Sequence, residues 1–424
     1  MIEITDQQLL CILKEEFVPA LGCTEPIACA LACAKCTEVL GNTPESIEVL
    51  VSGNIFKNGM GAGIPGTGMY GLPIAAALGA ICGKSEYGLE VLKDINQDNL
   101  PLGKQMLKDN NVSINVKDDA TDKLYAEAIC KYKGNTAKVI IIHAHTNIVK
   151  IEKNNEIIFE KECNSKTEDN KRPELSVARI TKFINDVKFE DIKFLLDGVK
   201  MNNDISEDGL KNPYGLQVGK TIKENIETGV LGEDLLNLCL SRTTAASDAR
   251  MDGCPKPVMT NSGSGNQGIT VYMPVVAVAE YLKTDEEKLA RAIALSNLIA
   301  AHIHLYMGHL SALCGVIISA MGASAGITYL LGGDYDKIVN TIKTMTSNIT
   351  GMMCDGAKQG CALKVYSAVS AAVQASLVSV KGVICRNDGI VVDDIEQTIK
   401  NIGIIASEGM GITDNVILDI MKKK

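Results

Sequence analysis

Two different hydrophobic patterns divide this chain, and they constrain its fold more than any other feature. Residues 46–160 contain short runs in which apolar and polar residues alternate, which predicts β-strands. Residues 174–424 instead contain long apolar segments joined by glycine-rich junctions, which predicts closely packed helices. We therefore expect an α+β protein in which a mainly helical domain carries an inserted small α/β domain.

The expected domain boundaries follow from these patterns. Residues 1–44 predict two N-terminal helices, broken near Gly22, that pack with the helical domain. The small α+β domain then covers residues 45–162, and the helical domain covers residues 174–424. The polar, charged segment between them is typical of a linker. Two domains also agree with the length of 424 residues, which exceeds the usual limit of one hydrophobic core.

Several segments carry more specific expectations. The hairpin signal Asn154-Asn155 divides the apolar run of residues 147–159. The glycine-rich residues 53–71 lack the lysine and hydroxyl ending of a phosphate-binding loop, so we expect a flexible loop that faces the substrate. Residues 310–333 carry no charge and are long enough to span a bilayer, but they lack flanking anchors and predict a buried helix pair. The remaining expected strands and helices are residues 47–51, 112–116 and 137–145, and residues 73–82, 174–187, 222–227, 235–246, 275–283 and 286–307.

Composition and charge exclude several classes of protein. The net charge of -9 disfavours nucleic acid or an anionic membrane surface as the main partner. Glu15 and Glu16 interrupt any apolar region near the N-terminus, so no signal peptide is expected. We therefore expect a cytoplasmic protein whose 14 cysteines are reduced thiols rather than disulfides.

Three cysteines lie in two glycine-flanked motifs. Cys354 and Cys361 are seven residues apart, and Cys314 lies forty residues before Cys354. Thiolates are the preferred ligands of iron–sulfur clusters, and three of them leave one iron of a cubane open as a Lewis acid. The alternative is that these are ordinary buried thiols, because cysteine is among the most buried residue types.

A fourth cysteine, Cys23, directly precedes a helix that is predicted to begin at Thr24. The positive end of a helix lowers the pKa of a thiol, so Cys23 is a candidate for a reactive thiolate. The alternative is a buried structural cysteine. We expect that structural role for Cys29, Cys33 and Cys36, which lie inside the predicted helix.

Residues 263–268 match the GxGxxG pattern of a dinucleotide-binding loop, but they do not open a convincing βαβ unit. The same segment resembles the loop that holds cofactor phosphate or substrate carboxylate in pyridoxal-phosphate β-eliminases. Those enzymes need a Schiff-base lysine well upstream, and none presents itself. The loop amides and Asn266 could instead hold the carboxylate of an amino acid.

The histidines form two groups. His143 and His145 are expected on one face of a strand, while His302, His304 and His309 are expected around a helix end. Neither group has the spacing of a zinc site. We expect them to lie in the polar core or to line an active site.

Five motifs together resemble those of the archaeal and bacterial L-cysteine desulfidases, a family related to the iron–sulfur L-serine dehydratases. The resemblance covers essentially the whole chain, and the paired cysteine motifs are specific. The motifs are residues 21–26 (LGCTEP), 261–268 (NSGSGNQG), 310–315 (LSALCG), 354–364 (CDGAKQGCALK) and the tail around residues 408–410.

The resemblance implies that Cys314, Cys354 and Cys361 ligate a 4Fe–4S cluster. It also implies that Cys23 replaces a histidine of the serine dehydratases as catalytic base. The implied reaction is β-elimination of L-cysteine to pyruvate, ammonia and sulfide, with the substrate thiolate on the open iron. The candidate substrate-binding residues are Thr24, Ser262, Ser264, Asn266 and Lys358, the last of which could instead pair with Asp355.

Other functions remain open at this point. An iron–sulfur serine dehydratase would release the same pyruvate from a different substrate, and a pyridoxal-phosphate lyase would release it with a different cofactor. A cysteine-rich cluster sensor is disfavoured, because no DNA- or partner-binding element is visible. We expect a homo-oligomer that binds the small molecule L-cysteine and neither nucleic acid nor a membrane.

Overall fold

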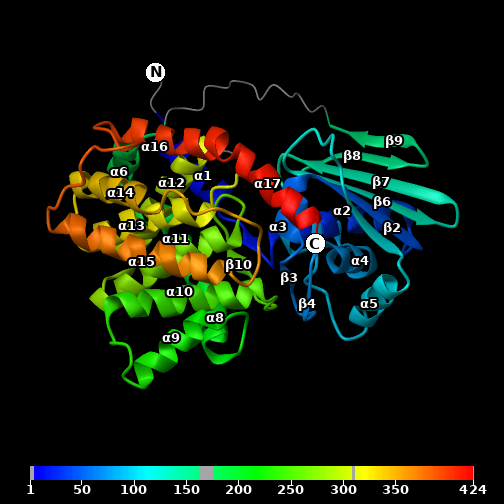
Figure 1. The fold of residues 1–424 in the computed structure, drawn as a ribbon, viewed down its shortest axis with the longest axis horizontal. Coiled ribbons are helices and arrows are strands. Elements are labelled where there is room, and N and C mark those ends of the chain that lie inside the picture. The colour runs from blue at the N-terminus through cyan, green and yellow to red at the C-terminus, as the bar shows by residue number, and fades with distance from the viewer. Residues whose placement is uncertain (1–3, 162–174, 308–310, 424) are drawn as a thin grey trace.

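The computed structural model describes residues 4–161, 175–307 and 311–423, which form a helical lobe and a sheet lobe lying side by side (Figure 1). The α+β class predicted from the sequence is confirmed. The sheet lobe is inserted into the helical lobe, because α1 (Asp6–Glu15) packs against α12 (Glu286–Met307) before the chain enters the sheet lobe. At the other end of the chain, α17 (Gly411–Lys422) reaches across to α3 (Gly53–Gly59) of the sheet lobe.

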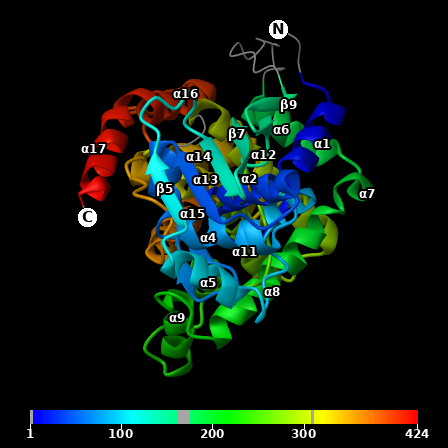
Figure 2. The ribbon, with the colours of Figure 1, turned by 90° about the vertical axis from the view of Figure 1, so that its right-hand side faces the viewer.

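The sheet lobe is built on six strands in the order β5-β2-β6-β7-β8-β9. Only β2 and β5 are parallel, and every other neighbouring pair is antiparallel. Helix α2 packs on β6 and β7, and α4 packs on α2. In Figure 2 this lobe faces the viewer, with the helical lobe behind it. Its further elements are α2 (Thr24–Leu40), β2 (Ser46–Val51), β3 (Gly63–Ile64), β4 (Met69–Tyr70), α4 (Leu72–Cys82), a 3-10 turn (Ser85–Glu90), α5 (Leu100–Lys108), β5 (Val112–Val116), β6 (Tyr125–Tyr132), β7 (Asn135–Ile142), β8 (Ile148–Lys153) and β9 (Glu156–Glu160).

The helical lobe surrounds α13, which packs against α11, α12, α14 and α15. Small residues allow these helices to approach closely: a Cβ atom at Gly322 would lie 2.3 Å from the carbonyl oxygen of Ser296. A two-stranded pairing of β1 (Pro19–Ala20) with β10 (Val258–Met259) joins the start of the chain to this lobe. Its further elements are α6 (Val177–Asp186), α7 (Phe189–Ile192), α8 (Leu195–Lys211), α9 (Val218–Glu227), α10 (Leu235–Met251), α11 (Gly265–Leu282), α13 (Gly315–Leu330), α14 (Tyr335–Ile349), α15 (Cys361–Val380), α16 (Ile395–Ile404) and a π-helical turn (Ile405–Gly409).

Some boundaries differ from those expected. Of the two N-terminal helices, only α1 packs with the helical lobe; α2 packs against the sheet because apolar side chains cover nearly all of its surface. The expected linker of residues 163–173 lies outside the described residues. The hairpin turn at Asn154-Asn155 is confirmed, because both residues have positive φ and join β8 to β9.

Two expectations about glycine-rich segments are wrong. Residues 53–71 do not form one flexible loop, because they fold into α3 and the β3-β4 hairpin. In the apolar segment that begins near residue 310, the described part forms one helix, α13, rather than a helix pair. Its small residues pack against neighbours on several sides, so a second helix is not needed to bury it.

Among the described residues, α15 is the one helix with the length and apolar character needed to cross a membrane. More than half of its most apolar stretch, 56%, is buried inside the protein. Core helices commonly have both properties.

Candidate active site

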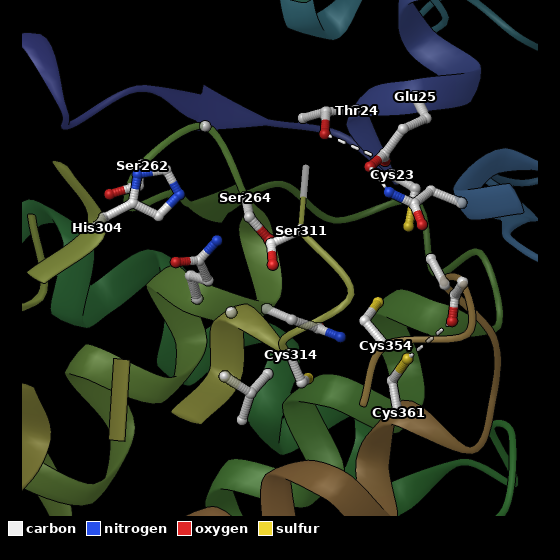
Figure 3. Close-up of a pocket in the computed structure, with 18 of the residues that line it drawn as sticks. Cys23, Thr24, Glu25, Ser262, Ser264, His304, Ser311, Cys314, Cys354 and Cys361 are labelled. Carbon is white, nitrogen blue, oxygen red and sulfur yellow. Dashed lines mark hydrogen bonds between the residues drawn. The ribbon is translucent and has the colours of Figure 1, made fainter. Parts of the chain in front are cut away.

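A cavity of about 140 Å³ lies where the two lobes meet. The sheet lobe contributes Cys23, Thr24 and Asn58 to its lining, and the helical lobe contributes residues such as Ser264 and Cys314. Figure 3 shows Cys23 facing the three cysteines of the helical lobe across this space. A cavity of this size holds a molecule about as large as benzene, for which ~150 Å³ suffices.

The three motif cysteines meet at one end of the cavity because two loops pair with each other. Leu313 and Met353 form an isolated antiparallel bridge. On either side of it, the Cys314 amide donates to the carbonyl of Met352 at 2.9 Å, and the Cys354 amide donates to the carbonyl of Ala312 at 2.6 Å. The thiols of Cys314 and Cys354 are thereby brought within hydrogen-bonding contact. Cys361 lines the same end of the cavity.

Four helices begin at this cavity, and none has a side-chain cap. Cys23 precedes α2, Ser264 precedes α11, Cys314 precedes α13, and Cys361 is the first residue of α15. The first N–H groups of a helix have no acceptor within the helix, and its N-terminus carries partial positive charge. The arrangement therefore favours anionic groups in the cavity, including thiolates and carboxylates.

Cationic side chains add to this positive potential. The hydrogen bond from the Cys314 thiol lowers the pKa of Cys354, and the charges of Lys57 and Lys364 act in the same direction. Lys57 is buried, pairs with Asp414 of α17, and donates to the carbonyl oxygen of Cys354 at 3.3 Å. This end of the cavity is therefore suited to bind an electron-rich, anionic cofactor.

Cys23 occupies the position predicted for it, before the first residue of α2, but its protonation differs from the expectation. Burial raises the pKa of the Cys23 thiol to about 12, although nearby Arg250 acts to lower it. The expected lowering of the pKa by the helix N-terminus is therefore wrong for this structure, because the loss of solvent outweighs the helix dipole. Cys29, Cys33 and Cys36 are fully buried, as expected.

The donor set fits an iron–sulfur cluster. Within the described ranges, no group of three His, Cys, Asp or Glu side chains is arranged to hold a single metal ion. A cubane makes a different demand, because each thiolate binds a different iron atom. Three thiols in electropositive surroundings beside a small cavity meet that demand. All cysteines in the described part of the chain are free, so these thiols are available as ligands.

The predicted substrate-binding residues divide into two groups. Thr24, Ser262, Ser264 and Asn266 all line the cavity. Lys358 is not among the lining residues, because its amine pairs with Asp355. Partial burial raises the pKa of Asp355, but hydrogen bonds from Lys358 and from Lys364 outweigh this effect and lower it to about 2.

Gly356 shows why the Cys354–Cys361 segment contains glycine. It has a φ of 101°, and a Cβ atom there would lie 2.2 Å from the carbonyl oxygen of Lys57. The structure therefore ties this glycine to the contact between the lobes. Gly360 has neither a positive φ nor a close neighbour.

The histidines have separate roles. His302 is buried and bonds to Glu396 at 2.6 Å, and His143, in the turn after β7, bonds to Asp122 at 2.7 Å. His145 and His304 line the cavity. His309 lies outside the described residues.

The polar residues of the cavity that reasoning from the sequence did not assign to it include Arg250, Asn58 and Glu25. A signal for Arg250 was available, since residues 243–251 of α10 are small or apolar apart from Asp248 and Arg250. A buried charge within such a stretch is a candidate for function.

Comparison with known proteins finds a family model and several relatives that match this chain. The family model described as serine dehydratase alpha chain matches residues 86–419, which include the three motif cysteines but not Cys23. A UPF0597 protein of Phocaeicola vulgatus is 46% identical over 421 residues, covering 99% of this chain and 98% of its own. UPF0597 proteins of Oleidesulfovibrio alaskensis and Aeromonas hydrophila are 46% and 43% identical over 417 and 418 residues, each covering 97% of this chain and 97% and 95% of their own.

These matches are consistent with the resemblance to the L-cysteine desulfidases and their serine dehydratase relatives. They imply a lyase-type enzyme and an iron–sulfur cofactor. The matched segment covers most of the chain and contains the three motif cysteines, and the chain therefore belongs to the serine dehydratase alpha chain family.

Proposed function

We propose that this protein is an iron–sulfur-dependent lyase that eliminates the thiol of L-cysteine. The products are sulfide and aminoacrylate, which tautomerises and hydrolyses to pyruvate and ammonia. One observation carries the proposal: Cys314, Cys354 and Cys361 meet Cys23 at a cavity large enough for a small amino acid. The family supports lyase chemistry, and the choice of L-cysteine as substrate is ours.

We assign the cofactor as a 4Fe–4S cluster held by Cys314, Cys354 and Cys361. Three protein thiolates suit a cubane with one open iron. When bound, such a cluster supplies a Lewis acid that makes the leaving sulfur a better leaving group. The helix N-termini and Lys57 stabilise the negative charge of the three thiolates.

Cys23 is proposed as the base that removes the proton from the α-carbon. It faces the three motif cysteines across the cavity (Figure 3). Arg250 is the neighbour that favours its thiolate form, against the effect of burial. Thr24, Ser262, Ser264 and Asn266 line the remaining wall and are proposed to orient the substrate.

A second candidate is L-serine dehydration, which the description of the family model favours. The same residues would serve that reaction, with a hydroxyl as leaving group. A pyridoxal-phosphate mechanism has less support, because no lysine from the described ranges lines the cavity. The buried Lys57 is paired with Asp414.

The test is a comparison of substrates with protein purified without oxygen. We expect about four iron and four labile sulfide per chain, and release of sulfide and pyruvate from L-cysteine at a higher kcat/KM than release of pyruvate from L-serine. A preference for L-serine would replace the proposed substrate. Absence of iron and sulfide would overturn the cluster assignment.

The role of Cys23 has its own test. Cys23→Ala is expected to keep its iron but to lose about 10²- to 10⁴-fold in kcat, the usual contribution of a general base. Exchange of the substrate α-proton with deuterated solvent, followed by NMR, should be lost with it. Wild-type exchange would refute the base role, and loss of iron would make Cys23 a ligand instead.

We also propose that the enzyme acts in the cytoplasm as a homo-oligomer. Ile412, Val416 and Ile420 form an exposed apolar stripe on α17, which supports contact with a second copy. Light scattering tests this, and a monomeric mass at micromolar concentration would contradict it.

A further inference from the structure

The cavity between the lobes contains two side chains of opposite charge to which the sequence analysis assigned no role in binding. Arg250, at the end of α10, is 4% exposed, and Glu25 lies in the first turn of α2. Both line the cavity, and neither forms an ion pair with any residue in the described ranges. Arg250 is buried and Glu25 is half-buried. Removing a charge from water without an ion-pair partner is unfavourable, so each charge favours a ligand group of opposite sign.

Arg250 is held in place but has free bonding capacity. One terminal nitrogen donates to the carbonyl oxygen of Gly22 at 3.0 Å, and the other contacts the sulfur of Met251 at 3.5 Å. Its Nε atom is buried and has no hydrogen-bond partner. An arginine with an unused N–H group can bind one or both oxygens of a carboxylate.

The position of the guanidinium depends on Gly265. A Cβ atom at Gly265 would lie 2.2 Å from Nε and 2.7 Å from Cζ of Arg250. Glycine at the first position of α11 therefore leaves the space that the guanidinium occupies. This accounts for one glycine of the 263–268 segment in terms of a charged neighbour rather than a dinucleotide.

Backbone donors lie beside this guanidinium. The N-cap residue of α11, Ser264, makes no side-chain bond to the helix. The first bond of the helix runs from the Gly268 amide to the carbonyl of Ser264 at 3.0 Å, so the amides of residues 265–267 have no acceptor within the helix. Arg250 and this helix end together form a site of positive potential.

Glu25 supplies the opposite charge. Its two carboxylate oxygens accept only from neutral groups, the amide of Asn58 at 3.2 Å and the hydroxyl of Thr24 at 3.3 Å. The Oδ1 atom of Asn58 is itself buried without a partner. The wall formed by these residues can therefore accept further hydrogen bonds from a donor such as an ammonium group.

We propose that Arg250 and the N-terminus of α11 bind the carboxylate of an α-amino acid, while Glu25 and Asn58 bind its ammonium group. This assignment rests on the proposed function, and it specifies the substrate class as a small zwitterion. Both charges act on the Cys23 thiol: Arg250 lowers its pKa and Glu25 raises it. A substrate held at both ends would present its α-carbon to this thiol.

Lys358 was the alternative cation for the carboxylate. Its amine pairs with Asp355, and it does not line the cavity. Arg250 has neither disadvantage. The proposal therefore moves the carboxylate site from the cysteine motif to the end of α10.

Two truncated ligands test the two halves of the site separately. 3-Mercaptopropionate lacks the ammonium group of L-cysteine, and cysteamine lacks its carboxylate, so each ligand reports on one half of the site. Their affinities are measured by calorimetry with the oxygen-free holoenzyme. We expect Arg250→Met to lower the affinity for 3-mercaptopropionate at least about tenfold and to leave the affinity for cysteamine unchanged. Glu25→Gln is expected to do the reverse.

Matched variants guard against a general loss of structure. Arg242→Met changes another arginine of α10, whose partner is Glu280 outside the cavity, and should leave both affinities unchanged. If Arg250→Met does not fold, Gly265→Ala is used in its place. The added methyl group should displace the guanidinium and lower the affinity for 3-mercaptopropionate at least about tenfold. Equal weakening of both ligands, or no change in either, would overturn the assignment.

The outcome is separable from the proposed reaction. If the crossed pattern is found but L-cysteine yields no sulfide, the zwitterion site stands and the elimination falls. If sulfide is released normally while Arg250→Met and Glu25→Gln bind both ligands like the parent protein, the reaction stands and the site falls.

Discussion

Each lobe contains a group of three neighbouring cysteines, and the two groups differ in their surroundings. The site thiols are Cys314, Cys354 and Cys361 of the helical lobe. The core thiols are Cys33, Cys36 and Cys130 of the sheet lobe, all of which are 0% exposed. Cys130 on β6 is in hydrogen-bonding contact with both Cys33 and Cys36 of α2.

Proximity is common to both groups. In each, hydrogen bonds from neighbouring thiols lower the pKa of one cysteine, Cys130 among the core thiols and Cys354 among the site thiols. The core thiols are packed among alanine and aliphatic side chains, and no cation of the described residues is among the groups that shift their pKa values. The site thiols have a cavity, helix N-termini and lysines around them.

Under the proposed cluster assignment, sequence spacing is a poor guide to a metal centre. Cys33 and Cys36 have the CxxC spacing often found in metal sites, whereas Cys354 and Cys361 do not. Function follows from space for a ligand and from compensation of its charge, and both come from the surroundings.

The largest expected effect comes from removing one thiol of each group. Cys361→Ser is expected to lose its iron and essentially all activity, because a cubane left with two thiolates is poorly held. Cys130→Ser should keep both. Iron analysis and sulfide release check this. Full iron content in Cys361→Ser would show that the two groups do not differ in the way described.

The second prediction removes a cation that only the site thiols have. Lys57→Met leaves Asp414 buried without its partner, which should lower the free energy of unfolding by about 3 kcal/mol or more. Urea denaturation measures it. Lys422→Met, whose amine pairs with Asp118 at the surface at 3.1 Å, is the control and should cost less than about 1 kcal/mol. A similar loss of unfolding free energy in both variants would show that the buried Lys57–Asp414 pair stabilises the protein no more than a surface pair.

The third prediction compares how accessible the site thiols and the core thiols are to an alkylating reagent. After removal of iron with a chelator, iodoacetamide should modify Cys354 and Cys361 at least about tenfold faster than the core thiols, because reactivity needs exposure as well as thiolate character. Peptide mass spectrometry gives the rates. In urea the two groups should react alike, and a native protein without this difference would refute the sealed character of the core thiols.

The smallest effect is expected from removing the thiol group of one core cysteine. Cys130→Ala should lower the free energy of unfolding by about 1 to 2 kcal/mol, because it leaves a small cavity among well-packed side chains. Its iron content should not change. Thermal unfolding together with iron analysis checks both, and any loss of iron would give the core thiols an unexpected link to the cofactor.

Local features of the chain were predictable from the sequence alone. The alternation of residues 47–51 identified β2, and Asn154-Asn155 identified a hairpin, because both depend on conformational preferences of adjacent residues. The start of α2 after Cys23 was also predictable. The assignment of the cysteine motifs to a cofactor stays a prediction. The α+β class follows from the two hydrophobic patterns for the same reason.

Long-range packing decided the rest. Strand β6, the neighbour of both β2 and β7, was missed, because it is buried on both faces and its small residues show little alternation. Only the fold places α2 on the sheet and the guanidinium of Arg250 against Gly265, fifteen residues further along the chain. The high pKa of Cys23 likewise depends on how completely two lobes exclude water from one thiol. Burial and electrostatic environment are properties of groups that meet from distant parts of the chain, so no local pattern contains them.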